Sequence, residues 1–285
     1  MQVVARHDVD RQWADQQAAG LAKKTPVFIA LVAKNPRALN SVTNRTLMET
    51  QYRTAADPAA TLLPVWESVV LAMQASSAVF VTGLAGGAEA RFRLRDENWC
   101  IPGTGPTIDT DAGNWLRALW PAMICREKRR VDVLASVPEE LLRGSGAGFD
   151  DYIYDWVKAL RIYWRGEDGL VDALLAAMRG TEPGALRVAA PELVLELLYP
   201  PIELFYHFTQ RDEAKFNDSL VRALELHRRF WTKDEDRRSD PNGFVSFPLL
   251  AIAALAEDAG LTIDVESEYL PTTLLHGDRV GEFPT

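Results

Sequence analysis

Apolar residues recur at helical spacing over much of the chain. The clearest case is Phe149, Ile153, Trp156, Leu160 and Tyr163, which follow one another at steps of four, three, four and three residues. Residues at these steps share one face of an α-helix, and such a face normally packs against a core. The pattern therefore predicts an amphipathic helix over residues 149–163.

A second helical stripe runs through Leu220, Leu224, His227 and Trp231, and any residue of the preceding segment 217–219 can cap its start. A lone histidine on an apolar stripe is typical of the core or of an interface, so we expect His227 to be structural. Further helices are predicted at about 8–23, 37–56, 58–82, 111–127, 168–179, 191–208 and 244–259.

Prolines should interrupt two of the predicted helices, and one uncharged stretch could be mistaken for a membrane span. Pro200 and Pro201 should end or sharply kink the apolar segment 193–208, and Pro121 should kink its helix, because proline lacks an N–H and clashes with the preceding turn. Residues 68–88 carry no charge and are long enough to cross a bilayer. Their polar residues and glycines favour a buried helix over a membrane span.

Two short segments alternate instead. Residues 90–95 place Ala, Phe and Leu between three arginines, and 99–101 follow a polar turn, which predicts a small β-hairpin. We expect Arg91, Arg93 and Arg95 to pair with carboxylates, since the protein is acidic. Residues 261–266 also alternate, after a Gly260 placed to end a helix.

These elements indicate an all-α fold with one small β-hairpin near residues 90–101. Consecutive helices with short connections pack as antiparallel neighbours, which predicts an irregular bundle or a solenoid-like stack of helical hairpins. No repeat period is visible, and no linker divides the chain. We therefore expect a single domain over residues 1–285.

Composition and charge narrow the functional classes. The chain has 285 residues, 47% of them hydrophobic and 25% charged, as in ordinary globular proteins. Its net charge of −9 disfavours direct binding to nucleic acid or to anionic membranes. Two cysteines provide no disulfide framework, and residues 1–8 become charged before any apolar run, so we expect a cytoplasmic protein without a signal peptide.

Familiar catalytic patterns are absent. The glycine-rich loop 144–148 lacks the lysine of a phosphate-binding P-loop, and Ser145 does not form a Gly-x-Ser-x-Gly elbow. The four histidines, His7, His207, His227 and His276, have no partner at the spacing of a zinc site. The sequence thus predicts no cofactor, no metal and no hydrolase chemistry.

One enzyme alternative remains open. The segment containing Asp150, Asp151 and Asp155 resembles the aspartate-rich helix end with which class I terpene synthases hold magnesium and diphosphate. Asn217 and Glu225 resemble the second metal motif of that family. Clustered carboxylates on facing helices can bridge hard cations to a diphosphate leaving group, so a magnesium-dependent diphosphate lyase is the alternative function.

Departures weaken that alternative. Val221 occupies the position of the middle metal ligand, and the two motifs lie closer together in the sequence than in the family. The carboxylates also have an ordinary explanation, because Asp150 and Asp151 begin a helix and Asp155 has Lys158 three residues later.

The last third of the chain carries a more specific resemblance. Segments 227–231 (HRRFW), 240–246 (DPNGFVS), 249–256 (LLAIAALA) and 265–271 (VESEYLP) resemble the immunity protein 49 family in order and spacing. The match covers about residues 220 to 275. The resemblance implies a helical bacterial immunity protein, which binds the toxin domain of a polymorphic toxin system in the cytoplasm and blocks it without catalysis.

Candidate toxin-binding residues follow from the same segment. Asp264, Glu266 and Glu268 lie on the polar side of the alternating run, and Tyr269 is of a type enriched in binding hot spots. An acidic inhibitor suits a nuclease with a basic cleft. The competing interpretation is structural: Glu266 or Glu268 would fix the segment by pairing with an arginine of the 228–229 or 237–238 pair.

A second candidate surface is the aromatic helix, with aromatic residues spread round it. They are either exposed to a partner or shared as core between two neighbouring helices. The residues are Tyr152, Tyr154, Trp156, Tyr163 and Trp164.

Overall fold

A computed structural model describes all residues, 1–285, and confirms an all-α fold. The main helices are α1 Arg11–Val32, α2 Ala38–Ala56, α3 Leu63–Ala85, α4 Ala112–Ile124, α5 Lys128–Ser136, α6 Glu139–Arg143, α7 Tyr152–Arg165, α8 Leu170–Gly180, α9 Pro191–Leu193, α10 Tyr199–Thr209, α11 Glu213–Trp231, α12 Glu235–Ser239, α13 Phe247–Asp258 and α14 Thr272–His276. Short 3₁₀ turns are η1 Ile108–Thr110 and η3 Pro241–Gly243, and η2 Val194–Leu198 is a π-helix. The strands are β1 Gln2–Val3, β2 Glu89–Leu94, β3 Glu97–Pro102 and β4 Val265–Glu266.

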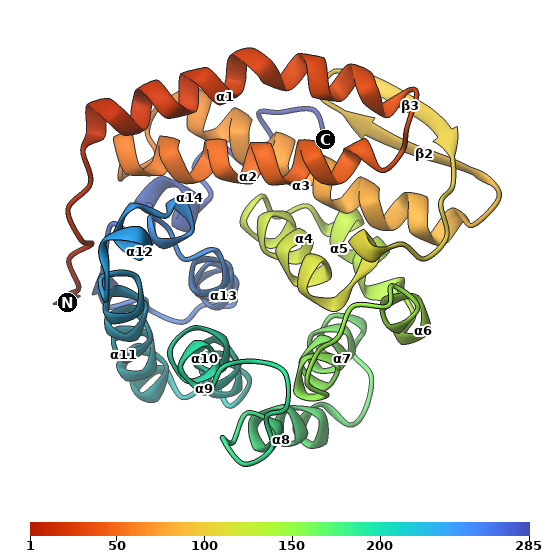
Figure 1. Cartoon of the computed structure of the whole chain (residues 1–285). Helices are drawn as coiled ribbons and strands as arrows, with labels where there is room; N and C mark the ends of the chain where they lie inside the picture. Colours follow the sequence, from red (N-terminus) through yellow and green to blue (C-terminus); the bar gives the residue numbers. More distant parts are fainter.

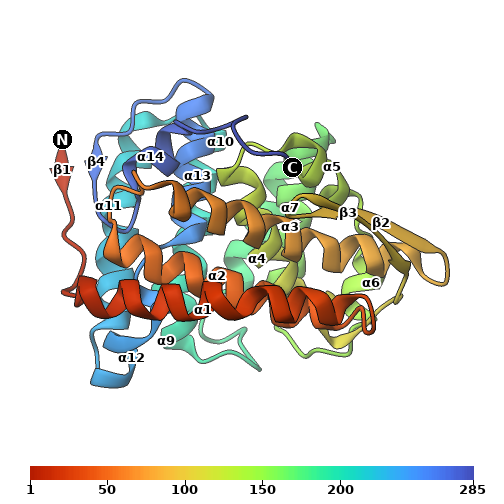
Figure 2. The same cartoon turned by 90° about the horizontal axis from the view of Figure 1, so that it is seen from above.

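The helices form a ring, seen along its axis in Figure 1. Consecutive helices pack against one another as α1 with α2, α2 with α3, α7 with α8 and α10 with α11. In Figure 2 the axes of the long helices α1, α2 and α3 lie side by side along the molecule, and the direction of the chain alternates from one helix to the next. The chain thus stacks helical hairpins, as predicted, but bends the stack round until its end meets its beginning.

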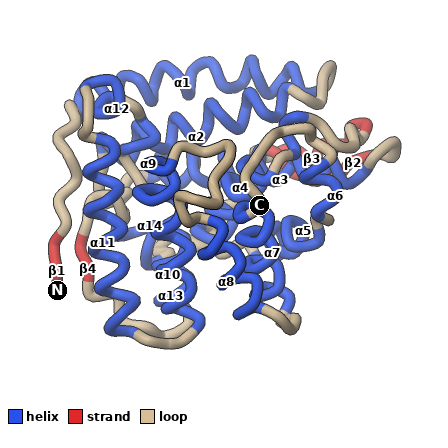
Figure 3. The backbone as a smooth tube through the Cα atoms, turned by 60° about the horizontal axis from the view of Figure 1, so that its bottom comes forward, coloured by secondary structure: helices blue, strands red, loops and turns tan.

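Backbone hydrogen bonds at two places help to close the ring. Strand β1 pairs in parallel with β4, with Gln2 opposite Val265 and Val3 opposite Glu266, and Figure 3 shows the two strands side by side at one edge. Thr273 at the start of α14 donates from its backbone N–H to Ala59 O, just beyond α2 (3.1 Å). One cluster of 70 buried apolar residues consequently extends from Val4 to Leu275.

Helix α3 is the uncharged stretch that could have crossed a membrane. It is the one helix long and apolar enough for that, and 83% of its most apolar 18-residue window is buried inside the protein. The hydroxyls of Ser76 and Ser77 donate to Ala72 O and Met73 O, both at 2.7 Å. Internal bonds of this kind satisfy polar groups in a core, so the prediction of a buried helix is confirmed.

Prolines act differently from the prediction. Pro200 and Pro201 do not end the apolar helix, because the π-helix η2 precedes them: Tyr199 N–H donates to Val194 O, five residues earlier. A π-turn changes the pairing of the backbone where the prolines provide no N–H. Pro121 lies inside α4, which ends three residues later at Ile124, close to the predicted end at 127. Arg126 then turns the chain at φ +55° before α5 begins.

The β-hairpin lies where the sequence placed it. Strands β2 and β3 pair antiparallel, with Leu94 opposite Glu97. The arginines do not follow the prediction. Arg91 lies 3.4 Å from Glu89 in an exposed pair, while the Nε of Arg93 donates to the backbone oxygen of Arg95. Only the first of the three arginines has a carboxylate partner, because the hairpin projects its polar face into solvent.

Candidate functional site

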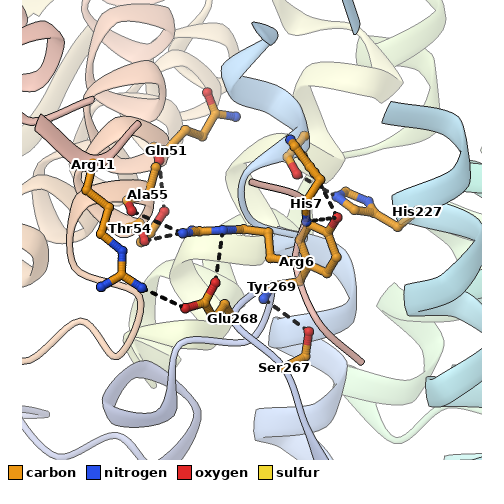
Figure 4. Close-up of polar contacts among 11 residues, drawn as sticks. Arg6, His7, Arg11, Gln51, Thr54, Ala55, His227, Ser267, Glu268 and Tyr269 are labelled. Carbon is orange, nitrogen blue, oxygen red and sulfur yellow. Dashed lines mark hydrogen bonds and ion pairs between the residues drawn. The ribbon is translucent and has the colours of Figure 1, made fainter. Parts of the chain in front are cut away.

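Tyr269, the predicted surface anchor, lies in the interior. Its side chain is fully buried, and its hydroxyl lies 2.8 Å from Nδ1 of His7 and accepts from the His7 backbone N–H at 3.2 Å (Figure 4). Its ring meets the ring of His227 edge to face at 4.8 Å. This corrects the expectation that Tyr269 contacts a partner directly: it fastens the N-terminal segment to α11.

Burial shifts the pKa values of the side chains in this aromatic cluster. It raises the pKa of Tyr269 to about 12 and lowers the pKa of His227 to about 4, because the charged form of each ring would lose its water. The pKa of His7 is lowered for the same reason. His227 Nε2 lies 3.1 Å from Gly243 O, so the neutral ring donates there. His227 is a core histidine, as predicted.

Glu268 pairs with arginines other than those expected. Its carboxylate, 41% exposed, lies 3.0 Å from Arg11 and 3.5 Å from the Nε of Arg6. The buried Arg6 guanidinium also donates to the carbonyls of Thr54 (3.0 Å) and Ala55 (3.1 Å) at the end of α2. The partners come from the N-terminus because residues 2–11 lie along this edge, which no local pattern in the sequence indicated.

Asp264 and Glu266 form the exposed part of the C-terminal edge. Asp264 pairs with the N-terminal amine at 2.8 Å, and Glu266 is exposed without an ion pair. Asn217 fixes the backbone of this segment. Its side-chain Nδ2 donates to Thr262 O (2.9 Å), and its Oδ1 accepts from Asp264 N–H (2.8 Å). Together with Glu268, these two carboxylates remain accessible to a partner.

The first acidic motif of the enzyme alternative is occupied by structural contacts. Asp150 is buried and accepts from the backbone N–H groups of residues 187–189, at 2.6 to 3.0 Å. Burial opposes its ionisation, but these bonds outweigh it and lower its pKa. The exposed Asp151 pairs with Arg143, and burial raises the pKa of Asp155.

The second acidic motif does not join the first. Asn217 supports the chain before β4, as described above, and Glu225 is exposed on α11. No group of three or more histidine, cysteine, aspartate or glutamate side chains is placed to hold a metal ion. The structure therefore does not assemble the terpene-synthase-like metal site.

The aromatic helix α7 serves the core. Trp156 and Tyr163 pack edge to face on Phe205 of α10, at 5.3 and 5.1 Å between ring centroids. Tyr152 and Tyr154 are buried as well, and Trp164 is half-buried with its Nε1 donating to Asp132 at 2.7 Å. Of the two interpretations left open, the shared core is confirmed.

A central pocket is the largest concave feature among those described. Its volume is about 580 Å³, and it is lined by α2, α4, α7, the segment from residue 188 to 201, α11 and residues 242–248. Pockets of this size accommodate a ligand or a few side chains of a partner. Nothing in the sequence pointed to it, because its walls meet only when the ring closes.

Comparison with known proteins gives one match. The model of the family described as Immunity protein 49 matches residues 57–274. No curated protein and no solved structure matches the chain. The match extends well beyond the segment that carried the resemblance and includes the helices from α3 to the start of α14. The chain belongs to the immunity protein 49 family.

Proposed function

We propose that this protein binds the toxin domain of a cognate polymorphic toxin in the cytoplasm and neutralises it by occupying the toxin, without catalysis. The observation that carries the proposal is the family match over residues 57–274, since an immunity protein implies a toxin as its partner. The structural roles of the acidic motifs agree with it, because Asp150 and Asn217 hold backbone segments in place.

We further propose a basic toxin, such as a nuclease. The net charge of −9 favours fast association with a positively charged cleft. Asp264, Glu266 and Glu268 form an exposed acidic edge that suits such a cleft. Association should then slow several-fold as salt rises from about 0.05 to 0.5 M, since screening shortens the range of the attraction. A salt-independent association rate, or an acidic toxin, would contradict this charge assignment.

The test is co-expression in a surrogate bacterium with the toxin domain encoded next to this protein. Growth restored by this protein, with the two chains eluting together, is the expected result. Glu266→Lys should weaken rescue, because Glu266 is exposed, lacks an ion pair and can be reversed in charge without breaking a contact. Glu182→Lys in the turn after α8 is the matched control, since Glu182 is also exposed and unpaired but lies away from β4.

Failure of the wild-type protein to rescue or to bind would refute the proposed function. Rescue by Glu266→Lys at the wild-type level would retain the function and remove the acidic edge from the interface. The two outcomes separate the identity of the partner from the location of the contact.

A further inference from the structure

Part of the wall of the central pocket lies away from the acidic edge. In Figure 2, α9 and α12 lie on the side of the molecule opposite β1 and β4. The wall of the pocket includes Leu193 of α9 together with Trp231 and Asn242, the residues that flank the α12 segment. A partner that enters the pocket therefore uses a different surface from the carboxylates of the C-terminal edge.

The lining is mainly apolar and rich in aromatic side chains. They come from α4, α7, α11, α13 and the loop before α7. The aromatic lining residues are Trp120, Phe149, Tyr152, Trp156, Trp231 and Phe247. Rigid aromatic walls provide contact area at little cost in conformational entropy, so they suit an apolar guest.

Arg117 is the cation of this pocket that lacks a carboxylate partner. It lines the pocket from α4, is an exposed residue, and forms no ion pair. Its one hydrogen bond runs from Nη1 to Asn114 Oδ1 at 3.3 Å. Partial burial lowers the pKa of Arg117, and the negative charge of Asp111 opposes that effect. Most of its five N–H donors remain free for an anion.

The two acidic residues of the lining are already satisfied. Asp111 caps α4, accepting from Asn114 N–H at 2.9 Å and from the Asn114 side-chain amide at 2.6 Å. Asp150 is bound by the three backbone N–H groups of residues 187–189. Neither carboxylate forms a hydrogen bond with Arg117, although the charge of Asp111 raises its pKa. An incoming carboxylate would therefore find a guanidinium whose one hydrogen bond goes to a neutral amide oxygen, that of Asn114.

The mouth of the pocket exposes apolar groups. Val188 lines the pocket and is 62% exposed. The π-helix contributes Leu197 and Leu198 to the wall, and Leu195 of the same π-helix, which does not line the pocket, is 42% exposed. π-helical turns occur frequently at functional sites, and here the turn lies in one wall of the pocket. An apolar rim outside an apolar pocket favours a protein partner over a small polar metabolite.

We propose that the central pocket receives a loop tip of the toxin that carries an aliphatic or aromatic side chain next to a carboxylate, which pairs with Arg117. The inference rests on the proposed function and assigns the place where the toxin is anchored, which we call the anchor. The apolar side chain packs among the aromatic walls, and the carboxylate accepts from the free guanidinium donors. Buried aromatic and arginine contacts at the centre of an interface contribute most of the binding energy in many complexes.

The test measures the affinity of the purified toxin domain for the wild-type protein and for two pocket variants. Arg117→Glu reverses the charge, and Val188→Trp fills the mouth while keeping the backbone N–H that binds Asp150. Each should weaken binding by at least about tenfold. Arg129→Glu is the matched control, since Arg129 is an exposed α5 arginine without side-chain contacts, outside the pocket. It should bind within about twofold of wild type, and unchanged thermal midpoints establish that all three variants fold.

The outcomes separate the inference from the function. If the wild-type protein does not bind the toxin, the proposed function fails and the anchor fails with it. If it binds and both pocket variants bind equally well, the function stands and the anchor is refuted.

Binding of a fluorescent aromatic anion, anilinonaphthalene sulfonate, tests whether the pocket receives a segment of the toxin or a small anion. The wild-type protein should bind it, Arg117→Glu should lose it, and saturating toxin should displace it. Bound dye that saturating toxin leaves in place would assign the pocket to a small anion and overturn the toxin assignment.

Discussion

Protonation of His227 should destabilise the protein as the pH falls. The ring is buried and donates to Gly243 O. Its centroid lies 4.8 Å from the ring centroid of Tyr269 and 6.1 Å from that of Trp231. Its pKa of about 4 lies below the value of 6.5 expected in an unfolded chain. The unfolded state therefore binds a proton over a range of pH in which the folded state does not.

The sign and size of the effect follow from this difference. The stabilisation is complete above pH 6.5 and is lost as the pH falls towards 4, because each added proton favours the unfolded chain. The pKa difference amounts to about 3 kcal/mol once the loss is complete, and to about 2 kcal/mol between pH 7 and pH 5. His7, whose pKa is also lowered, adds a loss of the same sign.

His227→Gln isolates this contribution. A glutamine amide can donate to Gly243 O in place of the ring, and it does not titrate. Urea unfolding of both proteins at pH 7 and pH 5 gives four free energies of unfolding. The wild-type value should drop by about 2 kcal/mol more than that of the variant, since all other groups titrate alike in both. Equal drops in the two proteins would refute the assignment of a buried neutral His227.

Three further substitutions test the structural roles assigned above. Asp150→Ala should lower the free energy of unfolding by about 3 kcal/mol in urea, because three backbone N–H groups lose their acceptor; a loss below about 1 kcal/mol would contradict that role. Gly243→Ala should cost about 2 kcal/mol in thermal unfolding, since its Cβ would lie 2.7 Å from Trp231 Cγ; an unchanged midpoint would show that the ring can move. Arg6→Ala should cost about 2 kcal/mol and Arg11→Ala less than about 1 kcal/mol, because only the first is buried with two carbonyls to satisfy; equal losses would contradict this difference.

The helices that the sequence predicted best are those with a local apolar stripe. Helix α7 begins and ends near the predicted residues, because a periodic face is a property of neighbouring residues. Helix α11 ends at Trp231 as expected but begins at Glu213, because Asp212 caps it and the predicted cap 217–219 lies inside the helix. The first helix extends to Val32, well past the predicted end at 23, and it passes through Pro26. Its second half is stabilised by packing along α2, which is a tertiary effect.

The candidate site was predictable in position but not in orientation. The alternating run correctly placed Asp264 and Glu266 outward, since a period of two separates the faces of an extended segment. Tyr269 turned inward because the N-terminal segment, more than 250 residues away, supplies His7 as its partner. Contacts at such separation have no local pattern in the sequence.

The pocket could not be predicted from the sequence for the same reason. Arg117 occupies an ordinary polar position of an amphipathic helix, and only closure of the ring faces it toward α11 and the segment after α8. The π-helix in the pocket wall was signalled by Pro200 and Pro201, but as a break in the helix and not as a change in its pairing.

The measurement that tests the central claim most directly is a titration of toxin activity with the purified protein. Neutralisation by binding predicts that activity falls linearly with added protein, reaches its minimum at a fixed stoichiometry and does not change further with time. Substoichiometric protein that inactivates all of the toxin with time would demonstrate catalysis, and undiminished toxin activity at a molar excess would contradict neutralisation itself.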